Sequence, residues 1–301
     1  MKPKTLFVVG NGFDLFHGVG STYSEFGEYV RRTNGSLHKT FEKYFSFEGN
    51  WAKLEETLAC LDINSIVEDA SEFLVSYGSD EWNDSDNHTY QWEVNKTVRE
   101  LSAGLKTAFT AWVLQLSIPH LGNYTGKRLR VHSDAVFLTF NYTPTLEALY
   151  GIPRESICYI HNRIETANSQ IILGHAVDPS GQLPMNNGVD LEVQDVRVTE
   201  GNKILDSYFG RTFKPTAKII CEKREFFDQL YGTTQIVVIG HSLSTVDLPY
   251  FNEIANRIES NSSWVVTYRN PANNGLIAAL DKLGISATQR SMVHVDSLTE
   301  A

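Results

Sequence analysis

Two glycines flank an asparagine early in the chain, in the sequence Gly10-Asn11-Gly12-Phe13-Asp14. Because glycine has no side chain, a turn built from it lets backbone N–H groups approach a phosphate or a ribose closely. The Asp14 carboxylate suits a hydrogen bond from a ribose hydroxyl as well as a cap on the turn that follows. A glycine turn of this kind also occurs without any ligand. These five residues are therefore candidates for nucleotide binding that need support from the rest of the sequence.

Asn141 and His161 each follow a short β-prone run, and both side chains could take part in a reaction. The Asn141 amide offers a donor and an acceptor, so it could hold a water or a ribose hydroxyl. Alternatively, Asn141 could cap a helix that begins near Pro144. A histidine exchanges protons near neutral pH, which suits His161 to activating a ribose hydroxyl or water. An isolated histidine is more often structural, but its place at a strand end favours catalysis; Gly174-His175 could supply a second imidazole.

A further group of polar residues consists of Gly240-His241-Ser242, followed by Ser244 and Asp247. Ser242 resembles the serine of a hydrolase G-x-S-x-G turn, but that motif requires glycine where Ser244 stands. We therefore expect small residues at the start of a helix, where free N–H groups bind a ribose or a phosphate. Asp247 could interact favourably with the helix dipole in the first turn. Gly240, His241, Ser242 and Asp247 are the second set of candidate nucleotide-binding residues.

Predicted strands must position these polar residues. The β-prone runs comprise residues 5–9, 135–140, 157–160, 235–239 and 264–268. Their apolar character and the helical patterns between them are typical of a parallel sheet with crossover helices. In such sheets ligands bind in a crevice at the carboxyl ends of the strands. We therefore predict an α/β protein with a Rossmann-like parallel sheet, whose strand ends bring Gly10, Asn141, His161 and Gly240 together.

Helical periodicity dominates the segment between the first and second predicted strands. Tyr23, Phe26 and Val30 recur at intervals of three and four residues. A crossover between parallel strands needs only one helix, so we predict that residues 21–118 form a large helical insertion or subdomain. Residues 1–20 and 119–301 would form the Rossmann-like core. The glycines and prolines of residues 176–188 predict a long loop, which could act as a lid.

Composition limits the classes of function. The 36 acidic and 26 basic residues give a net charge of -10, which disfavours binding to nucleic acid or to an anionic membrane. No apolar stretch reaches the roughly 20 residues of a membrane span, and the start lacks a signal-peptide core, so we expect a cytoplasmic location. The three cysteines are far apart and the nine histidines show no metal-ligand spacing, so we expect no metal.

Taken together, these motifs resemble the AbiH family of bacteriophage abortive-infection proteins. The resemblance rests on VVGNGFDLFHGV near the start, Trp51-Ala52-Lys53-Leu54-Glu55, LTFNYTPTLE at residues 138–147, the strand end at His161, ILGHA at 172–176 and VVIGHSLSTVDLPYF at 237–251. The motifs occur in the expected order over nearly the whole chain. The resemblance implies a role in defence against bacteriophage by abortive infection.

The same landmarks are more remotely similar to sirtuin-like NAD-binding domains. That similarity implies that the glycine turns surround NAD and that Asn141 and His161 act in cleavage of the nicotinamide–ribose bond. Two positions depart from the pattern: Thr143 stands where many such NADases have aspartate, and Asn162 stands where glycine usually follows the histidine. The first change would alter ribose binding, and the second would crowd the site. The cysteines of zinc-bearing sirtuins are missing, which argues against protein deacylation.

The sequence therefore predicts an NAD glycohydrolase-like enzyme that uses NAD or a related nucleotide. Asn141 would hold the water or a ribose hydroxyl, and His161 would act as the base. The main alternative is a non-catalytic sensor that responds to a phage-derived or host nucleotide and signals to a partner; a metal-independent nuclease is a third. A toxic NADase requires restraint, for which residues 21–118 are the candidate. The sequence leaves a homo-oligomer open.

Overall fold

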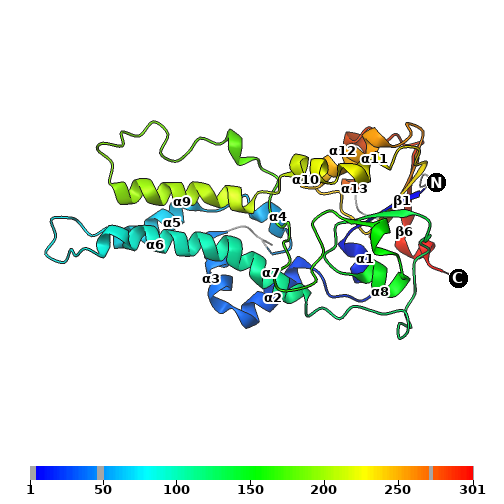
Figure 1. The fold of residues 1–301 in the computed structure, drawn as a ribbon, viewed down its shortest axis with the longest axis horizontal. Coiled ribbons are helices and arrows are strands. Elements are labelled where there is room, and N and C mark those ends of the chain that lie inside the picture. Colours follow the sequence, from blue (N-terminus) through cyan, green and yellow to red (C-terminus); the bar gives the residue numbers. More distant parts are fainter. Residues whose placement is uncertain (1–4, 46–50, 271–273, 301) are drawn as a thin grey trace. The chain divides into compact units, whose positions relative to one another are not determined.

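The computed structural model describes residues 5–45, 51–270 and 274–300 (Figure 1). Contacts between Cα atoms divide the chain into two compact units. The sheet unit comprises Met1–Thr22, Trp112–Ile172 and Pro215–Ala301, and the helical unit comprises Tyr23–Ala111 and Leu173–Lys214. The chain therefore passes from one unit to the other four times. The grouping of residues 173–214 with residues 23–111 has no counterpart in the division predicted from the sequence.

Six parallel strands form one sheet in the order β3-β2-β1-β4-β5-β6. They are β1 (Thr5–Val9), β2 (Val136–Thr139), β3 (Ile157–Tyr159), β4 (Gln235–Ile239), β5 (Ser263–Tyr268) and β6 (Arg290–His294). Rossmann folds have the same strand order, which reverses between β1 and β4 and leaves a crevice at their carboxyl ends. The predicted α/β class and Rossmann-like parallel sheet are confirmed. The sequence did not predict β6.

Both faces of the central strands are buried, which explains their continuous apolar sequences. Leu6 and Val8 of β1 contribute to the core on one face, and Phe7 and Val9 to the core on the other. The first face packs against α10 (Thr216–Glu222), α11 (Arg224–Asp228), α12 (Leu248–Arg257) and α13 (Asn274–Lys282). The second face packs against α1 (Asn11–Phe16) and α8 (Thr145–Tyr150). The sheet is therefore the middle layer of three.

Helices make up the helical unit. They are α2 (Tyr23–Thr33), α3 (Gly35–Tyr44), α4 (Leu54–Thr57), α5 (Ile63–Ala70), α6 (Asp86–Arg99), α7 (Leu105–Val113, whose last two residues belong to the sheet unit) and α9 (Val196–Thr212). A π-helical turn, Glu100–Gly104, joins α6 to α7. Phe26 and Val30 of α2 are buried, as their spacing predicts. Gly201 lets α9 approach α6, because a Cβ at that position would lie 2.3 Å from the Tyr90 ring.

Residues 176–195 lack α-helix and strand, in agreement with the predicted break in regular structure. They contain one 3-10 turn, Pro179–Gly181; the other 3-10 turns of the described residues are Ser71–Phe73, Arg154–Ser156 and Val295–Leu298. Several of the segment's apolar side chains are exposed to solvent: Val177, Leu183, Val189, Leu191 and Val193. The segment therefore presents apolar surface to water without a helix or strand to organise it.

The chain enters and leaves the last part of the helical unit at neighbouring positions. His175 forms a parallel bridge with Phe213, in which His175 N–H donates to Thr212 O and Lys214 N–H donates to His175 O. The fully buried Lys214 ammonium donates to Glu55 Oε1 at 2.7 Å. A buried charge is costly unless it is paired, so this ion pair fixes the exit of the chain to the helical unit.

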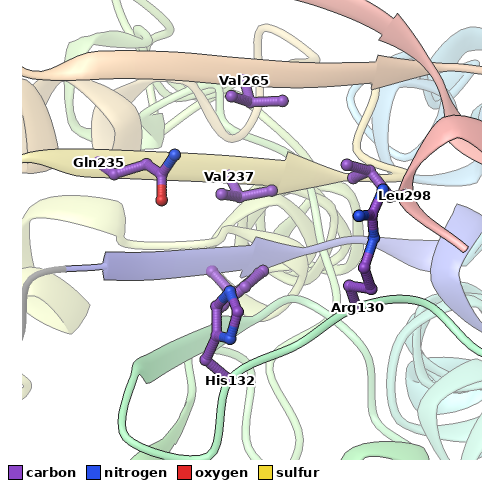
Figure 2. A pocket seen from close by; sticks show the side chains of 7 residues that line it. Arg130, His132, Gln235, Val237, Val265 and Leu298 are labelled. Atoms are coloured by element: carbon purple, nitrogen blue, oxygen red, sulfur yellow. The ribbon is translucent and has the colours of Figure 1, made fainter. Parts of the chain in front are cut away.

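A pocket of about 310 Å³ lies on one face of the sheet, over β1, β4 and β5 (Figure 2). It is lined by Phe7, Arg130, His132, Gln235, Val237, Val265 and Leu298. The lining contains none of the site residues predicted from the sequence. Along the described ranges, none of the helices has the length and apolar character needed to cross a membrane.

Candidate functional site

Four of the predicted site residues follow neighbouring strands along one edge of the sheet. The register pairs Val9 of β1 with Thr139 of β2 and with Ile239 of β4, and Thr139 with Tyr159 of β3. The residues that follow these positions by one or two places are Gly10, Asn141, His161 and Gly240. Because the strands are parallel, their carboxyl ends meet at one edge, where open α/β sheets bind ligands.

The first glycine turn packs directly against the turn that follows β4. Gly12 N–H donates to Gly240 O at 2.8 Å, and Gly10 N–H donates to Ile239 O at 2.9 Å. A Cβ on Gly10 would lie 2.7 Å from Gly240 O, and one on Gly12 would lie 2.7 Å from Gly240 Cα. Glycine is therefore needed here so that two loops of the protein can touch. That these turns also approach a phosphate stays a prediction.

The other residues of the first turn have different surroundings. Asn11 is exposed, and its Oδ1 accepts a hydrogen bond from Ser21 Oγ at 2.5 Å. Phe13 is fully buried in the core of the sheet unit, where its ring contacts those of His17 and Tyr150. Phe13 therefore stabilises the fold, whereas Asn11 is accessible from solvent.

Asp14 links the first turn to the loop after β2. Its carboxyl group is buried, and Thr143 Oγ1 donates a hydrogen bond to its Oδ2 at 2.5 Å. Burial raises the pKa of Asp14 to about 6, while the neighbouring Thr143, Thr145 and Asn141 side chains act in the opposite direction. Asp14 Oδ1 has no hydrogen-bond partner within the part of the chain that the structure describes. Asp14 thus keeps one unused acceptor beside Asn141.

Asn141 does not cap the helix that follows. α8 begins at Thr145 and has Pro144 at its N-cap position, so the capping role considered for Asn141 is wrong. A cap must directly precede the first turn to reach its N–H groups, and Asn141 lies too early in the chain. Its own N–H donates to Thr139 Oγ1 at 3.1 Å, and its buried side chain lies close enough to Asp14 to lower the pKa of that carboxyl.

Asp247 lies between the imidazoles of His161 and His241. Asp247 Oδ1 is 3.8 Å from His161 Nε2, and Asp247 Oδ2 is 3.5 Å from His241 Nε2. Ser244 Oγ also donates to Asp247 Oδ2, at 3.2 Å. Both histidines and the aspartate are buried. The sequence placed His161 and Asp247 in separate roles, and the structure brings them into one His–Asp–His cluster.

The chain after β4 does not open directly into a helix. α12 begins at Leu248, with Asp247 at its N-cap position, and residues 241–244 have no regular structure. The prediction that Gly240-His241-Ser242 opens a helix is therefore wrong. Within this irregular loop Ser242 is exposed, while the buried His241 ring lies beside Asp247.

Aromatic rings surround His161. The distances between its ring centroid and those of Phe140, Tyr250 and Tyr142 are 5.4, 5.8 and 6.0 Å. Tyr142 is itself fixed, because its hydroxyl donates to Ile172 O at 2.6 Å. Surroundings of this kind exclude water and strengthen the interaction between a charged imidazole and a carboxylate.

Both histidines of the cluster are followed by unusual backbone conformations. Asn162 directly follows His161 and has φ of 64°, and Leu243 follows His241 by two residues and has φ of 53°. Of the residues that the structure describes, these two alone combine a side chain with positive φ. For leucine this conformation costs roughly 1–2 kcal/mol. Strain of this kind is concentrated at functional sites, where it serves to orient side chains.

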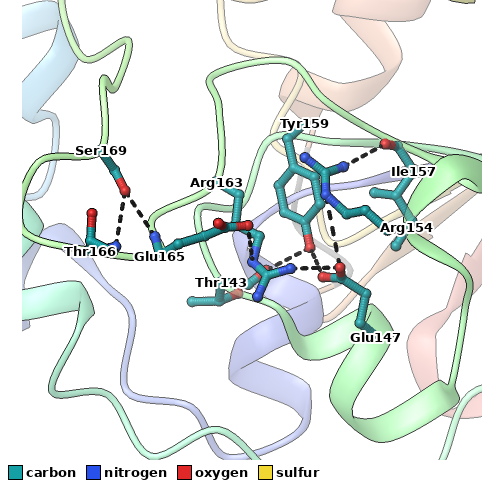
Figure 3. A network of polar contacts seen from close by, with 9 residues as sticks. All are labelled: Thr143, Glu147, Arg154, Ile157, Tyr159, Arg163, Glu165, Thr166 and Ser169. Carbon is teal, nitrogen blue, oxygen red and sulfur yellow. Dashed lines mark hydrogen bonds and ion pairs between the residues drawn. The ribbon is translucent and has the colours of Figure 1, made fainter.

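A network around Glu147 supports the loop after β2 from the side of α8 (Figure 3). Glu147 accepts hydrogen bonds from Tyr159 at 2.5 Å and from Arg163 at 2.6 Å, and Arg154 lies 3.9 Å away. The Tyr159 hydroxyl is also 3.3 Å from Thr143 O. Sequence reasoning missed this network, because its members share no motif and are joined only by the fold.

His175 is not part of this cluster in the sheet unit. It belongs to the helical unit, where its ring contacts those of Phe209 and Phe213. The second imidazole beside Asp247 is that of His241. Over the described residues, no group of three or more His, Cys, Asp or Glu side chains is arranged to hold a metal ion.

The model of a family described as "Bacteriophage abortive infection AbiH" matches residues 6–268. This range contains β1 except Thr5, β2 to β5, the helical unit and every residue of the strand-end site. No curated protein and no solved structure matched the chain.

Proposed function

The chain belongs to the AbiH family of bacteriophage abortive-infection proteins, and we propose that its strand-end site binds NAD or a related nucleotide and cleaves the nicotinamide–ribose bond. One observation carries the proposal: Asn141, His161 and the buried Asp14 follow neighbouring strand ends in a sheet with the Rossmann strand order. Such an edge is where dinucleotides bind in folds of this type.

The side chains at this edge suit an N-glycosidic cleavage. Breaking the bond between C1′ and the nicotinamide nitrogen leaves the electron pair on the nitrogen and oxocarbenium character on the ribose. Asn141 holds a water, whose oxygen forms the new bond to C1′, and His161 takes the proton that this water loses. Asp14 Oδ1 is an acceptor available to a ribose hydroxyl. The products are nicotinamide and ADP-ribose.

A nucleotide sensor is the second candidate, and the burial of the site favours it. Asp14, Asn141, His161 and Asp247 each expose 7 % or less of their surface. The Gly10 and Gly12 N–H groups already bond to backbone oxygens. A ligand must therefore move part of this edge to enter, which would suit a protein that changes conformation when a phage-derived trigger or nucleotide arrives.

Mass spectrometry of nucleotide mixtures tests the proposal. Purified protein is incubated with NAD, ATP and related nucleotides, with and without extract from phage-infected cells. We expect wild type to release nicotinamide and ADP-ribose, and Asn141→Ala and His161→Ala each to lower that rate by about 100-fold or more, the usual effect of losing an acid–base group.

Two exposed residues supply matched controls. Asn123→Ala and His132→Ala remove the same chemical groups from the surface of the sheet unit and should retain the wild-type rate. Tight binding of NAD without product, under both conditions, would favour the sensor. Equal rates in wild type and Asn141→Ala would remove Asn141 from the mechanism.

A further inference from the structure

We propose that Asp247 and His241 are positioning residues that hold the His161 ring and stabilise its charged form, an inference that rests on the proposed function. The sequence assigned both residues to nucleotide contacts. In the structure the Asp247 carboxylate lies beside the Nε2 atoms of both His161 and His241. A carboxylate beside one nitrogen of an imidazole favours the tautomer that carries its proton there, and it stabilises the imidazolium that forms when the ring accepts a second proton.

Hydrogen bonds define the orientation of His241. Leu243 N–H donates to His241 Nδ1 at 2.9 Å, so this nitrogen is an acceptor and the neutral ring carries its proton on Nε2. That Nε2 faces Asp247 Oδ2 at 3.5 Å. His241 and Ser244 therefore both present donors to the same oxygen of Asp247, which leaves the other oxygen, Oδ1, facing His161.

The simplest alternative is that Asp247 merely caps α12. It occupies the N-cap position, yet its side chain accepts no cap hydrogen bond from the described first turn of that helix. Its two oxygens instead lie near Nε2 atoms from the ends of two different strands. The helix dipole still favours a negative charge at this place. The carboxylate of Asp247, at the start of α12, therefore lies beside His161 and does not cap the helix.

The backbone around the cluster supports an orienting role. Gly240, which precedes His241, and Leu243 have φ of 63° and 53°. A Cβ on Gly240 would meet the backbone of Gly12 and Phe13 at 2.5–2.6 Å, so the loop cannot relax toward the first turn. The strained Leu243 supplies the N–H that fixes the His241 ring. The costly backbone conformation of Leu243 therefore serves to orient the His241 ring.

Several groups that titrate or carry charge face His161 from the elements packed around it. They are Asp247, which directly precedes α12, Tyr250 of α12 and Tyr142 from the loop after β2, and His241 lies on the other side of Asp247. Asp247 is the carboxyl group among them. Replacing it by an amide should lower the pH at which His161 loses its proton, because a nearby carboxylate favours the protonated imidazole.

The first test needs no substrate. Nuclear magnetic resonance of protein with ¹⁵N-labelled histidine follows each imidazole across a pH titration, and His161→Ala identifies the His161 signals. We expect Asp247→Asn to lower the midpoint of the His161 titration by about one pH unit. Asp134→Asn, which alters an exposed carboxylate of the same unit, should leave it unchanged. An unchanged His161 titration in a folded Asp247→Asn protein overturns the proposal.

The second test uses the NAD-cleaving reaction. Asp247→Asn should lower kcat by at least about 10-fold with little change in KM, and should move the acidic limb of the kcat profile to lower pH. His241→Gln, which keeps an N–H donor near Asp247, should retain more activity than His241→Ala. Equal loss in both His241 variants contradicts the positioning role. If neither the wild type nor any variant cleaves NAD but the His161 titration shifts, the positioning role stands and the proposed reaction fails.

Discussion

The carboxyl group of Asp14 connects stability to pH. Burial raises its pKa to about 6 from the ordinary value of 3.8. Between these two pH values the folded chain keeps a proton that the unfolded chain has released. The raised pKa of Asp14 therefore adds to the free energy of unfolding in full below pH 3.8, and this gain is lost as the pH rises to about 6. Above that pH the folded protein must hold a buried negative charge.

Asp14→Asn should remove this dependence, because an amide stays neutral at every pH. Relative to wild type, the variant should gain unfolding free energy as pH rises from 4 to 7, by up to about 3 kcal/mol. Urea unfolding of both proteins at several pH values measures this difference. A difference that is the same at pH 4 and pH 7 would mean that Asp14 does not titrate in the folded state.

Strand-end reasoning predicted which single residues would follow neighbouring strands at one edge of the sheet, but not how they would interact. Asn141, His161 and Gly240 were recognisable because each follows a β-prone run. The partnership of Asp247 with both histidines was not, since it depends on a loop that turns back through Leu243 with positive φ. No pattern in one sequence distinguishes such a loop from the first turn of a helix.

The turns that follow β1 and β4 are packed against each other. The turn after β1 and the turn after β4 touch through Gly10, Gly12 and Gly240, on the two sides of the point where the strand order reverses. Each turn thereby restricts the position of the other at the carboxyl ends of the strands. A side chain at this contact would force the two loops apart, and with them the residues that each loop carries.

Gly12→Ala should therefore destabilise the protein by about 1–3 kcal/mol, the usual cost of overpacking, since the new Cβ meets backbone that cannot rotate away. Thermal unfolding followed by circular dichroism measures the loss. Gly35→Ala in α3 is the matched control, because a Cβ there meets nothing within 4 Å. A melting temperature equal to that of the control would show that the two turns can separate without cost.

Burial explains which elements could be predicted. The runs that became β1 to β5 are apolar because most of their residues are covered. β6 lies at the edge of the sheet, and its Arg290-Ser-Met-Val-His sequence is only partly buried, so it lacks the apolar run that reveals a central strand. The helices of residues 23–111 were visible from their spacing, as Phe26 and Val30 illustrate.

At the scale of the whole molecule, the segment of residues 173–214 could not have been assigned from sequence. It lies between two parts of the sheet unit along the chain, yet its contacts are with the helical unit. What decides this is the buried ion pair of Lys214 with Glu55 and the packing of Gly201 on Tyr90. Each of these joins positions far apart in the sequence.

Limited proteolysis should cut first between residues 182 and 195, where chymotrypsin finds exposed leucines in backbone without helix or strand. The two fragments should still elute together on size exclusion, because α9 remains packed on α6 and β4 remains paired with β1. Denaturing gels and mass spectrometry locate the cut. Early cleavage inside α9, or separation of the fragments without denaturant, would contradict this arrangement.

The central position of β1 also has a consequence for synthesis on the ribosome. β1 is made first, but one of its two neighbours, β4, begins only at Gln235. Contacts so distant along the chain form slowly and late. Until the chain has emerged beyond Asp247, His161 has neither Asp247 nor His241 near it, and Gly12 has no Gly240 to touch. A chain that ends before Asp247 thus lacks part of the proposed site, so the topology leaves that site incomplete until β4 and the loop after it have been made.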